Sequence, residues 1–362
     1  MRVATVIGNR PQFVKAAAVS GPLRRAHEEL LIHTGQHYDE EMSQVFFAEL
    51  GLPAPEYRLD LGDATGASNA TQTARMLTAL EPLLRELAPD VVLVYGDTNS
   101  TLAGGLAAAQ LGLAVAHVEA GMRSYDRSMP EELNRVLTDH LSTLLLCPSR
   151  TSQENLASEG VLRGVSVVGD VMVDVARVVA PALAARGQIL DRLGVSDGDY
   201  LLVTAHRAGT VDDPDRLRRL VELLEALDAP TVLPLHPRTR ARLEAAGLLE
   251  RVSAAVQMCE PLGYLDFATL VAHARAVLTD SGGVQKEAYL AAVPCVTLRD
   301  RTEWVETLEA EWNVLVDLDP DRCAAALALP RPREHPPLYG DGHAAERVVA
   351  ALERLPAVVA RR

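Results

Sequence analysis

The sequence predicts an α/β protein made of two doubly wound halves, and three observations predict it. The chain has 362 residues, which is typical of two domains of roughly 100–200 residues each. Short apolar runs alternate with helix-like stretches along the chain. These runs are continuous rather than alternately apolar and polar, which is typical of strands buried on both faces of a parallel sheet.

The first half contains strand-like runs that end in polar or glycine-rich turns. The clearest is 91–95, where five apolar or aromatic residues precede Gly96 and Asp97. Helix-like stretches at 14–23 and 100–110 follow two of the runs, as expected when parallel strands are joined by helices. The expected strands are 3–7, 30–33, 91–95, 115–118 and 165–168.

The second half repeats this pattern. Leu217, Leu220 and Leu224 recur at helical spacing and predict a helix over 214–227. A second helix is expected at 284–290. The expected strands are 201–204, 231–235, 276–279 and 295–298.

The expected domains are 1–169 and 170–343, followed by a final helical segment, 344–362. The boundary is expected near 169–180, and 186–198 is expected to be a connecting region because it is richer in glycine and charge.

Composition narrows the class of protein. The formal net charge of −14 argues against a general nucleic-acid or membrane-surface binder, which would carry a basic face. The four cysteines are far apart, so reduced thiols are expected rather than disulfides or a zinc site. The apolar run at 3–7 is too short for a signal peptide, which favours a cytoplasmic protein. No GxGxxG follows it, so the fingerprint of a nicotinamide cofactor is absent.

Polar residues stand directly after many of the expected strands, where parallel α/β sheets bind ligands. They are expected to converge on one cleft between the halves. These residues are Arg10, Lys15, Asp97, Glu119, His206, Arg207, His236, Asp280 and Arg299.

Ser281, Gly282 and Gly283 have the properties of a phosphate site at a helix start, because free amides and the helix dipole favour an anion. The alternative is a plain helix cap with a glycine turn. Cationic side chains at other strand ends favour the phosphate interpretation, since a diphosphate is best held by several donors.

Asp97, Glu119 and Glu131 are the candidate acid/base groups. The alternative for each is a solvated carboxylate or a helix cap, and Asp97 stands close to the expected start of the helix 100–110. His206 is a candidate for the same site, or else a hydrogen-bonded core histidine. His117 and His140 are interpreted as structural.

Seven sequence blocks, in order and spanning nearly the whole chain, together resemble the UDP-N-acetylglucosamine 2-epimerase family. They are GNRPQ at 8–12, TGQHYD at 34–39, GDTNST at 96–101, HVEAGMR at 117–123, PEELNR at 130–135, TDSGGVQ at 279–285 and YGDG at 339–342.

The resemblance implies a glycosyltransferase-B-like fold, in which two Rossmann-like domains face each other across a cleft and the segment 344–362 returns to the first domain. It implies a homodimer, no metal and no nicotinamide cofactor. Asp97, Glu119 and Glu131 match the family's catalytic carboxylates, and His206 is counted with them. The residues that match positions holding UDP in the family are Arg10, Lys15, His206, Ser281, Gly282, Gly283 and Glu287. Phe267 matches the position that packs on uracil. The expected substrate-binding set is completed by Arg135, His236 and Arg299.

The chemistry implied is inversion at carbon 2 of a UDP-linked acetamido sugar, in a pathway that supplies cell-surface polysaccharide precursors. The carbon 2 proton is not acidic, so it leaves only as UDP departs from carbon 1 and a glycal forms. Carboxylates serve as acid and base, and cationic donors stabilise the departing diphosphate.

Two blocks depart from the pattern of many members. Many members read His-Arg-x-Glu-Asn where this chain has HRAGT at 206–210, so a Glu and an Asn are missing. Many members also read Thr-Glu-Arg-Pro-Glu where this chain has TEWVE at 302–306. The second departure resembles a branch that includes epimerases of UDP-2,3-diacetamido-2,3-dideoxy-glucuronate as well as enzymes for UDP-N-acetylglucosamine. A hydrolysing 2-epimerase, a glycosyltransferase on the same fold and a non-catalytic sensor of UDP-sugars are also compatible with the seven blocks.

Overall fold

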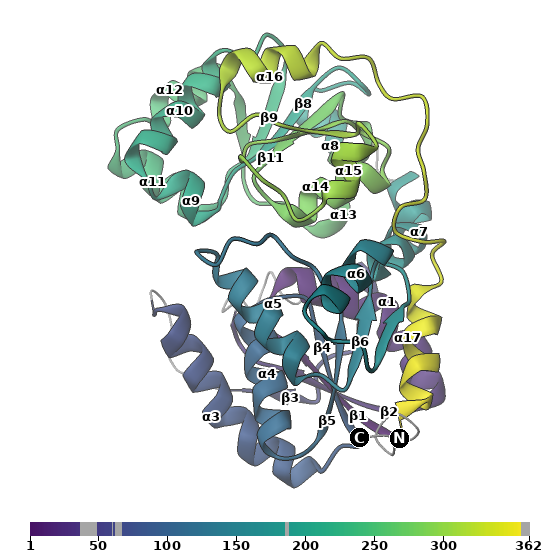
Figure 1. Cartoon of the computed structure of the whole chain (residues 1–362). Coiled ribbons are helices and arrows are strands. Elements are labelled where there is room, and N and C mark those ends of the chain that lie inside the picture. The colour runs from purple at the N-terminus through teal and green to yellow at the C-terminus, as the bar shows by residue number, and fades with distance from the viewer. Residues whose placement is uncertain (37–48, 60, 62–66, 185–187, 356–362) are drawn as a thin grey trace. The chain divides into compact units, whose positions relative to one another are not determined.

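The computed structural model describes residues 1–36, 49–59, 61, 67–184 and 188–355 (Figure 1). The chain divides into two compact domains. The first contains Met1–Val178 and the chain from Pro337 onward, and the second contains Val179–Pro336. The division falls within helix α7, Val171–Ala184. Residues 37–39 of the second sequence block and 356–362 of the expected final helix lie outside the described residues.

The first domain is built on a seven-stranded parallel sheet with the order β3-β2-β1-β4-β5-β6-β7. The order reverses between β1 and β4, and such a switch point is where ligands bind in doubly wound sheets. The strands are β1 Arg2–Ile7, β2 Glu28–His33, β3 Tyr57–Arg58, β4 Val91–Tyr95, β5 Ala114–Val118, β6 Leu144–Cys147 and β7 Val165–Val167.

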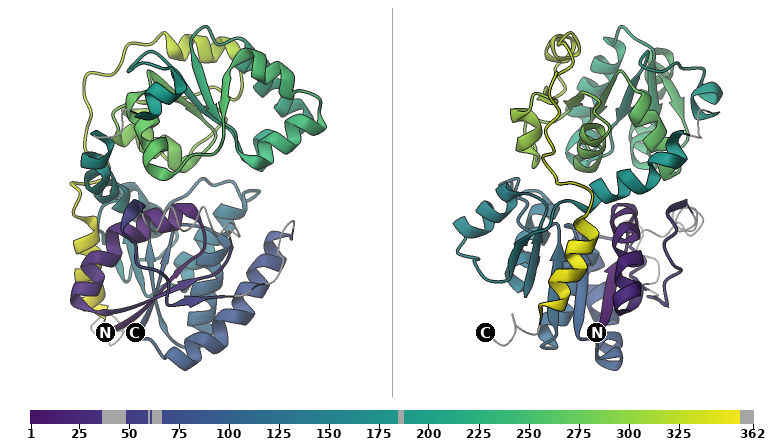
Figure 2. Two further views of the ribbon diagram at one scale, coloured as in Figure 1. Left: turned by 180° about the vertical axis from the view of Figure 1, so that it is seen from behind. Right: turned by 90° about the vertical axis from the view of Figure 1, so that its right-hand side faces the viewer.

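Helices cover this sheet, and the last helix of the chain packs beside the first (Figure 2). Asp174 ties that last helix in place, because its carboxylate accepts hydrogen bonds from the backbone N–H groups of Ala344 (3.1 Å) and Ala345 (2.9 Å). The helices are α1 Arg10–Ala26, α3 Asn69–Leu87, α4 Asn99–Gln110, α5 Pro130–Leu141, α6 Arg150–Ser158, α7 Val171–Ala184 and α17 Ala344–Glu353.

The second domain has a six-stranded parallel sheet with the order β10-β9-β8-β11-β12-β13, which reverses between β8 and β11. Its strands are β8 Leu201–Thr204, β9 Thr231–Pro234, β10 Gln257–Cys259, β11 Ala276–Thr279, β12 Cys295–Thr297 and β13 Asn313–Leu315. Its helices are α8 Gln188–Leu193, α9 Ala208–Val211, α10 Pro214–Glu225, α11 Pro237–Ala245, α12 Leu249–Ala255, α13 Tyr264–His273, α14 Gly282–Leu290, α15 Val305–Glu309 and α16 Pro320–Leu327.

Aliphatic side chains fill the interior of both domains. Every residue of β4 is fully buried, as the unbroken apolar run predicts for a central strand. Helix α4 packs closely on the sheet at Gly104, where a Cβ atom would lie 3.2 Å from Val6 and Val94. Leucine and valine side chains therefore fill the core in place of aromatic side chains, which are scarce in this sequence.

The predicted fold class, two doubly wound α/β domains, is confirmed, and the predicted strands match observed strands to within two residues at each end. Within the expected connecting region 186–198, helix α8 forms around the buried Ile189, which was not predicted. None of the helices in the described part of the chain combines the length and apolar character needed to cross a bilayer.

Candidate active site

Two expected acid/base residues lie at the carboxyl edge of the first domain's sheet, beside its switch point. Asp97 follows β4 and Glu119 follows β5. Lys15 reaches this edge from α1 and forms an ion pair with the Glu119 carboxylate, in which both side chains are largely buried. Glu119 adopts a left-handed backbone conformation with φ of 73°, which is uncommon for a residue with a side chain.

Gly96 makes room for this ion pair. Its φ is 63°, and a Cβ atom there would lie 3.2 Å from both Glu119 Oε2 and Lys15 Nζ. The glycine therefore meets two demands at once, the left-handed turn that ends β4 and the close approach of the charged pair.

Helix α5 holds Asp97 from the other side. Arg135 donates to the Asp97 carboxylate through two N–H groups, with Nε 3.2 Å from Oδ2, and donates through Nη1 to Glu132 (2.8 Å). Asn134 donates to the Asp97 backbone carbonyl (3.0 Å). The Asp97 side chain nevertheless keeps 32% of its surface exposed, so its carboxylate stays open on one side.

The helix-cap interpretation of Asp97 is wrong. Thr98 caps α4, and its side chain and that of Thr101 form a reciprocal capping box. A capping role therefore does not explain why an aspartate stands just before this helix.

Glu131 and Arg10 stand at helix starts on the same domain. Glu131 lies in the first turn of α5 after Pro130, as predicted, and is partly exposed. Its neighbour Glu132 is buried and accepts from the backbone of Ser124 and Tyr125, which fixes the loop before α5. Arg10 is the first residue of α1 and is partly exposed.

In the second domain, the buried Asp280 organises the ends of two neighbouring strands. Its carboxylate accepts from the backbone N–H groups of His206 (3.0 Å) and Arg207 (2.9 Å). The His206 ring stacks on the exposed His236 ring, with centroids 5.1 Å apart. The predicted pair of histidines at the ends of β8 and β9 therefore comes together.

The start of α14 has the features of an anion site. Ser281 is its N-cap residue, but its side chain makes no capping hydrogen bond. A Cβ atom on Gly282 would overlap the Glu303 carboxylate, which lies 3.1 Å from Arg299 Nη1 and 3.6 Å from Arg207 Nη2. Two arginines thus lie near the free amides of a helix start, where an anion is favoured.

Other expected binding residues occupy different surroundings. Phe267 is 8% exposed and packs in the apolar cluster that includes Ile189 and Tyr200. Glu287 is partly exposed on α14. Sequence reasoning missed Lys286, which is 1% exposed and places Nζ 3.7 Å from the Trp304 ring centroid. The only sign of this contact in the sequence was Trp304, which stands where many family members have an arginine.

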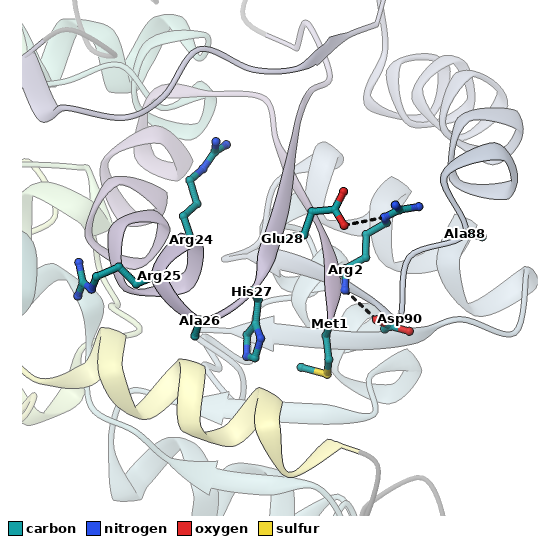
Figure 3. A pocket seen from close by; sticks show the side chains of 9 residues that line it. All are labelled: Met1, Arg2, Arg24, Arg25, Ala26, His27, Glu28, Ala88 and Asp90. Carbon is teal, nitrogen blue, oxygen red and sulfur yellow. Dashed lines mark hydrogen bonds and ion pairs between the residues drawn. The ribbon is translucent and has the colours of Figure 1, made fainter.

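A surface cavity of about 660 Å³ lies elsewhere, at the amino ends of β1 and β2 (Figure 3). Figure 3 shows Arg24 and Arg25 extending from the end of α1, apart from the ion pair of Arg2 with Glu28. No predicted site residue lines this cavity. The candidate active-site residues are therefore those at the carboxyl edges of the sheets and not those that line this cavity.

The sequence model of UDP-N-acetylglucosamine 2-epimerases matches residues 23–353. The chain belongs to the UDP-N-acetylglucosamine 2-epimerase family. The predicted resemblance is thereby confirmed.

Relatives in this family match over almost the full chain. A UDP-N-acetylglucosamine 2-epimerase homolog of Methanococcus maripaludis is 44% identical, covering 98% of this chain and 100% of its own. The UDP-2,3-diacetamido-2,3-dideoxy-D-glucuronate 2-epimerase of Pseudomonas aeruginosa is 45% identical over the same shares. The crystal structure of the Methanocaldococcus jannaschii UDP-GlcNAc 2-epimerase with UDP-GlcNAc and UDP has a TM-score of 0.90 at 39% identity, covering 98% of this chain and 99% of that one. The glycosyltransferase-B-like fold class is confirmed with it.

Proposed function

We propose that this protein is a non-hydrolysing epimerase that converts UDP-N-acetylglucosamine to UDP-N-acetylmannosamine. The observation that carries the proposal is the arrangement at the carboxyl edge of the first domain. There Asp97 and Glu119 stand at adjacent strand ends, one open to solvent and one paired with Lys15. The M. jannaschii enzyme, crystallised with UDP-GlcNAc and UDP, supports a UDP-sugar as substrate.

The reaction balances without a cofactor. A carboxylate takes the proton from carbon 2, the electrons of that C–H bond form the C1=C2 double bond, and the C1–O bond breaks as UDP leaves with its electron pair. UDP then adds back to carbon 1 while a proton is delivered to the opposite face of carbon 2. Acid and base must therefore stand near carbon 2 on both faces of the ring.

Asp97, Glu119 and Glu131 are proposed as the acid/base groups. Lys15 forms an ion pair with the Glu119 carboxylate and thereby holds it at the end of β5. Asp97 is oriented by Arg135 and exposes the rest of its carboxylate. His206 is proposed as a fourth catalytic residue at the second domain's sheet edge.

The second domain is proposed to bind UDP. Its amides at the start of α14 and the arginines beside Glu303 offer donors that suit a diphosphate leaving group, which gains negative charge as the C1–O bond breaks. The proposed substrate-binding residues are Arg10, Lys15, Arg135, His236, Phe267, Ser281, Gly282, Gly283, Glu287 and Arg299.

The test is product analysis by proton NMR with UDP-N-acetylglucosamine. The proposal expects UDP-N-acetylmannosamine in equilibrium with the starting sugar. Accumulation of UDP and free N-acetylmannosamine identifies a hydrolysing epimerase instead. Transfer of the sugar only when an acceptor is added identifies a glycosyltransferase.

A second candidate substrate is UDP-2,3-diacetamido-2,3-dideoxy-glucuronate. The relative of P. aeruginosa named for that substrate is 45% identical to this chain, which supports testing it. The two compounds are compared by kcat/KM in the same assay. A value at least tenfold higher for the uronate reverses the substrate assignment.

The family resemblance supports two further proposals, that the protein is a homodimer and that it works in the cytoplasm. Light scattering of the purified protein tests the first, since a monomer has a mass of 39.0 kDa. Fractionation of the producing cells tests the second. A monomeric or secreted protein contradicts the respective proposal.

A further inference from the structure

His117 lies on β5, two residues before Glu119, and its side chain is fully buried. Its ring contacts an acceptor at each nitrogen. Nδ1 lies 2.7 Å from Asp139 Oδ1, and Nε2 lies 2.6 Å from the carbonyl oxygen of Gly96. A carbonyl oxygen only accepts, so Nε2 must carry a proton. The protonation of Nδ1 then depends on whether Asp139 is ionised.

The surroundings of Asp139 favour the carboxylate. Its second oxygen, Oδ2, accepts from Arg123 Nη1 (2.7 Å) and from the backbone N–H of Gly121 (3.0 Å). Burial alone would raise the pKa of Asp139, and the charge and hydrogen bond of Arg123 act in the opposite direction. An ionised carboxylate only accepts, so Nδ1 donates to it.

Charge balance in this cluster, which is buried except for the partly exposed side chain of Glu159, agrees with this assignment. Arg123 also donates to both oxygens of Glu159, at 2.6 and 2.8 Å. Two cations, Arg123 and a doubly protonated His117, then match two carboxylates, Asp139 and Glu159. A buried ionic cluster persists only when its charges are paired and hydrogen-bonded, and this one meets both conditions.

The second bond of His117 holds the peptide that carries Asp97. The Gly96 carbonyl belongs to the Gly96–Asp97 peptide bond, and Gly96 lies directly under the Lys15–Glu119 ion pair. Asn134 holds the next carbonyl, that of Asp97, from α5. The His117 ring therefore connects the turn after β4 to the strand that carries Glu119 and, through Asp139, to α5.

We infer that His117 is held as an imidazolium that fixes the Gly96–Asp97 peptide and thereby sets the position of Asp97 relative to Glu119. It is a positioning residue, since it acts through the Gly96 carbonyl. The effect on turnover rests on the proposed function, whereas the protonation state does not.

The protonation state is tested by long-range proton–nitrogen NMR of the full chain with ¹⁵N-labelled histidine at neutral pH. The signals of His117 are identified by their loss in His117→Gln. We expect one buried ring with a proton on both nitrogens. A His117 ring with one bare nitrogen overturns the inference, whether or not the protein is an epimerase.

The positioning role is tested by steady-state kinetics of His117→Gln. Gln has one donor group and cannot donate to both Asp139 and Gly96, so we expect kcat to fall ~10²-fold through misplacement of Asp97. UDP affinity, measured by calorimetry, should change less than about threefold, because the proposed UDP site lies mainly on the other domain.

His140→Gln is the matched control. His140 is exposed and contacts the same cluster at its outer end, through Glu159 at 3.1 Å. The kcat of the His140→Gln variant should stay within about twofold of the wild-type value. An unchanged kcat in His117→Gln overturns the positioning role. Loss of UDP binding together with turnover also overturns it, since His117 would then serve folding alone.

Discussion

Asp97 and Glu119 differ in their surroundings although each follows a buried strand of the same sheet. Glu119 is 9% exposed and paired with Lys15, whereas the Asp97 side chain is 32% exposed and held by Arg135 on one side. Asp97 can therefore meet a substrate through the exposed side of its carboxylate while it stays paired with Arg135. A substitution of Asp97 is therefore the more direct test of an acid/base role.

Asp97→Asn should lower kcat by ~10³-fold, because a positioned acid/base group contributes in this range, while UDP affinity is kept. Asn keeps the size of the side chain and removes only its charge and basicity. Asp90→Asn is the control, since Asp90 precedes the same strand and binds the backbone of Arg2 at the opposite edge. Retained turnover in Asp97→Asn would refute its role as an acid or base.

The carboxylate of Asp139 should make stability depend on pH. Its lowered pKa in the folded state means that ionisation stabilises the fold above the unfolded value of about 3.9, and that this contribution is lost as the pH falls through the folded value. Asp139→Asn should therefore cost about 3 kcal/mol at neutral pH. Urea unfolding of both proteins should show this difference shrinking below about pH 4. A difference that does not vary with pH contradicts the assignment.

At the scale of elements, α14 begins with two glycines that differ in their surroundings. A Cβ on Gly282 would overlap Glu303, whereas the nearest atom to a Cβ on Gly283 is Ser281 Oγ at 3.9 Å. Gly282→Ala should lower the free energy of unfolding by ~1–3 kcal/mol through this overlap. Gly283→Ala should leave it unchanged or raise it by up to ~1 kcal/mol, because alanine favours the helix. Urea unfolding without ligand compares the two, and equal effects would contradict the crowding at Gly282.

The elements were predicted where local pattern decides structure. The continuous apolar runs of β4, β5, β8 and β11 could be read directly from the sequence. The strand β6 was not predicted, because a run such as 144–147 is equally compatible with a buried helix. Helix α8 was missed because glycine and charge on either side masked the short apolar face that buries Ile189.

The candidate site was only partly predictable for a different reason. The rule that ligands bind at strand ends found Asp97 and Glu119. Lys15 and Arg135 were expected to bind substrate, but their ion pairs with Glu119 and Asp97 were not predicted, because nothing in a local pattern specifies which helix face meets which strand end. His117 was interpreted as structural for this reason, since its two acceptors come from α5 and from the turn after β4.

At the scale of the whole molecule, the division of the chain into two compact units predicts separable folding. The segment Val179–Pro336 has its own parallel sheet, with an apolar cluster on each face. Expressed alone, it should unfold cooperatively in urea and bind UDP while lacking epimerase activity, because the carboxylates are on the other domain. A fragment without a cooperative transition would show that the second domain depends on the first.

Elimination and re-addition of UDP require that the proton at carbon 2 is exchanged with solvent, which incubation with UDP-N-acetylglucosamine in heavy water measures. We expect proton NMR to show UDP-N-acetylmannosamine with deuterium at carbon 2, and deuterium also to enter the recovered UDP-N-acetylglucosamine. Formation of the epimer with the original proton still at carbon 2 would overturn this reaction course, because the proton delivered to the opposite face must come from a second group and not from the one that removed the original proton.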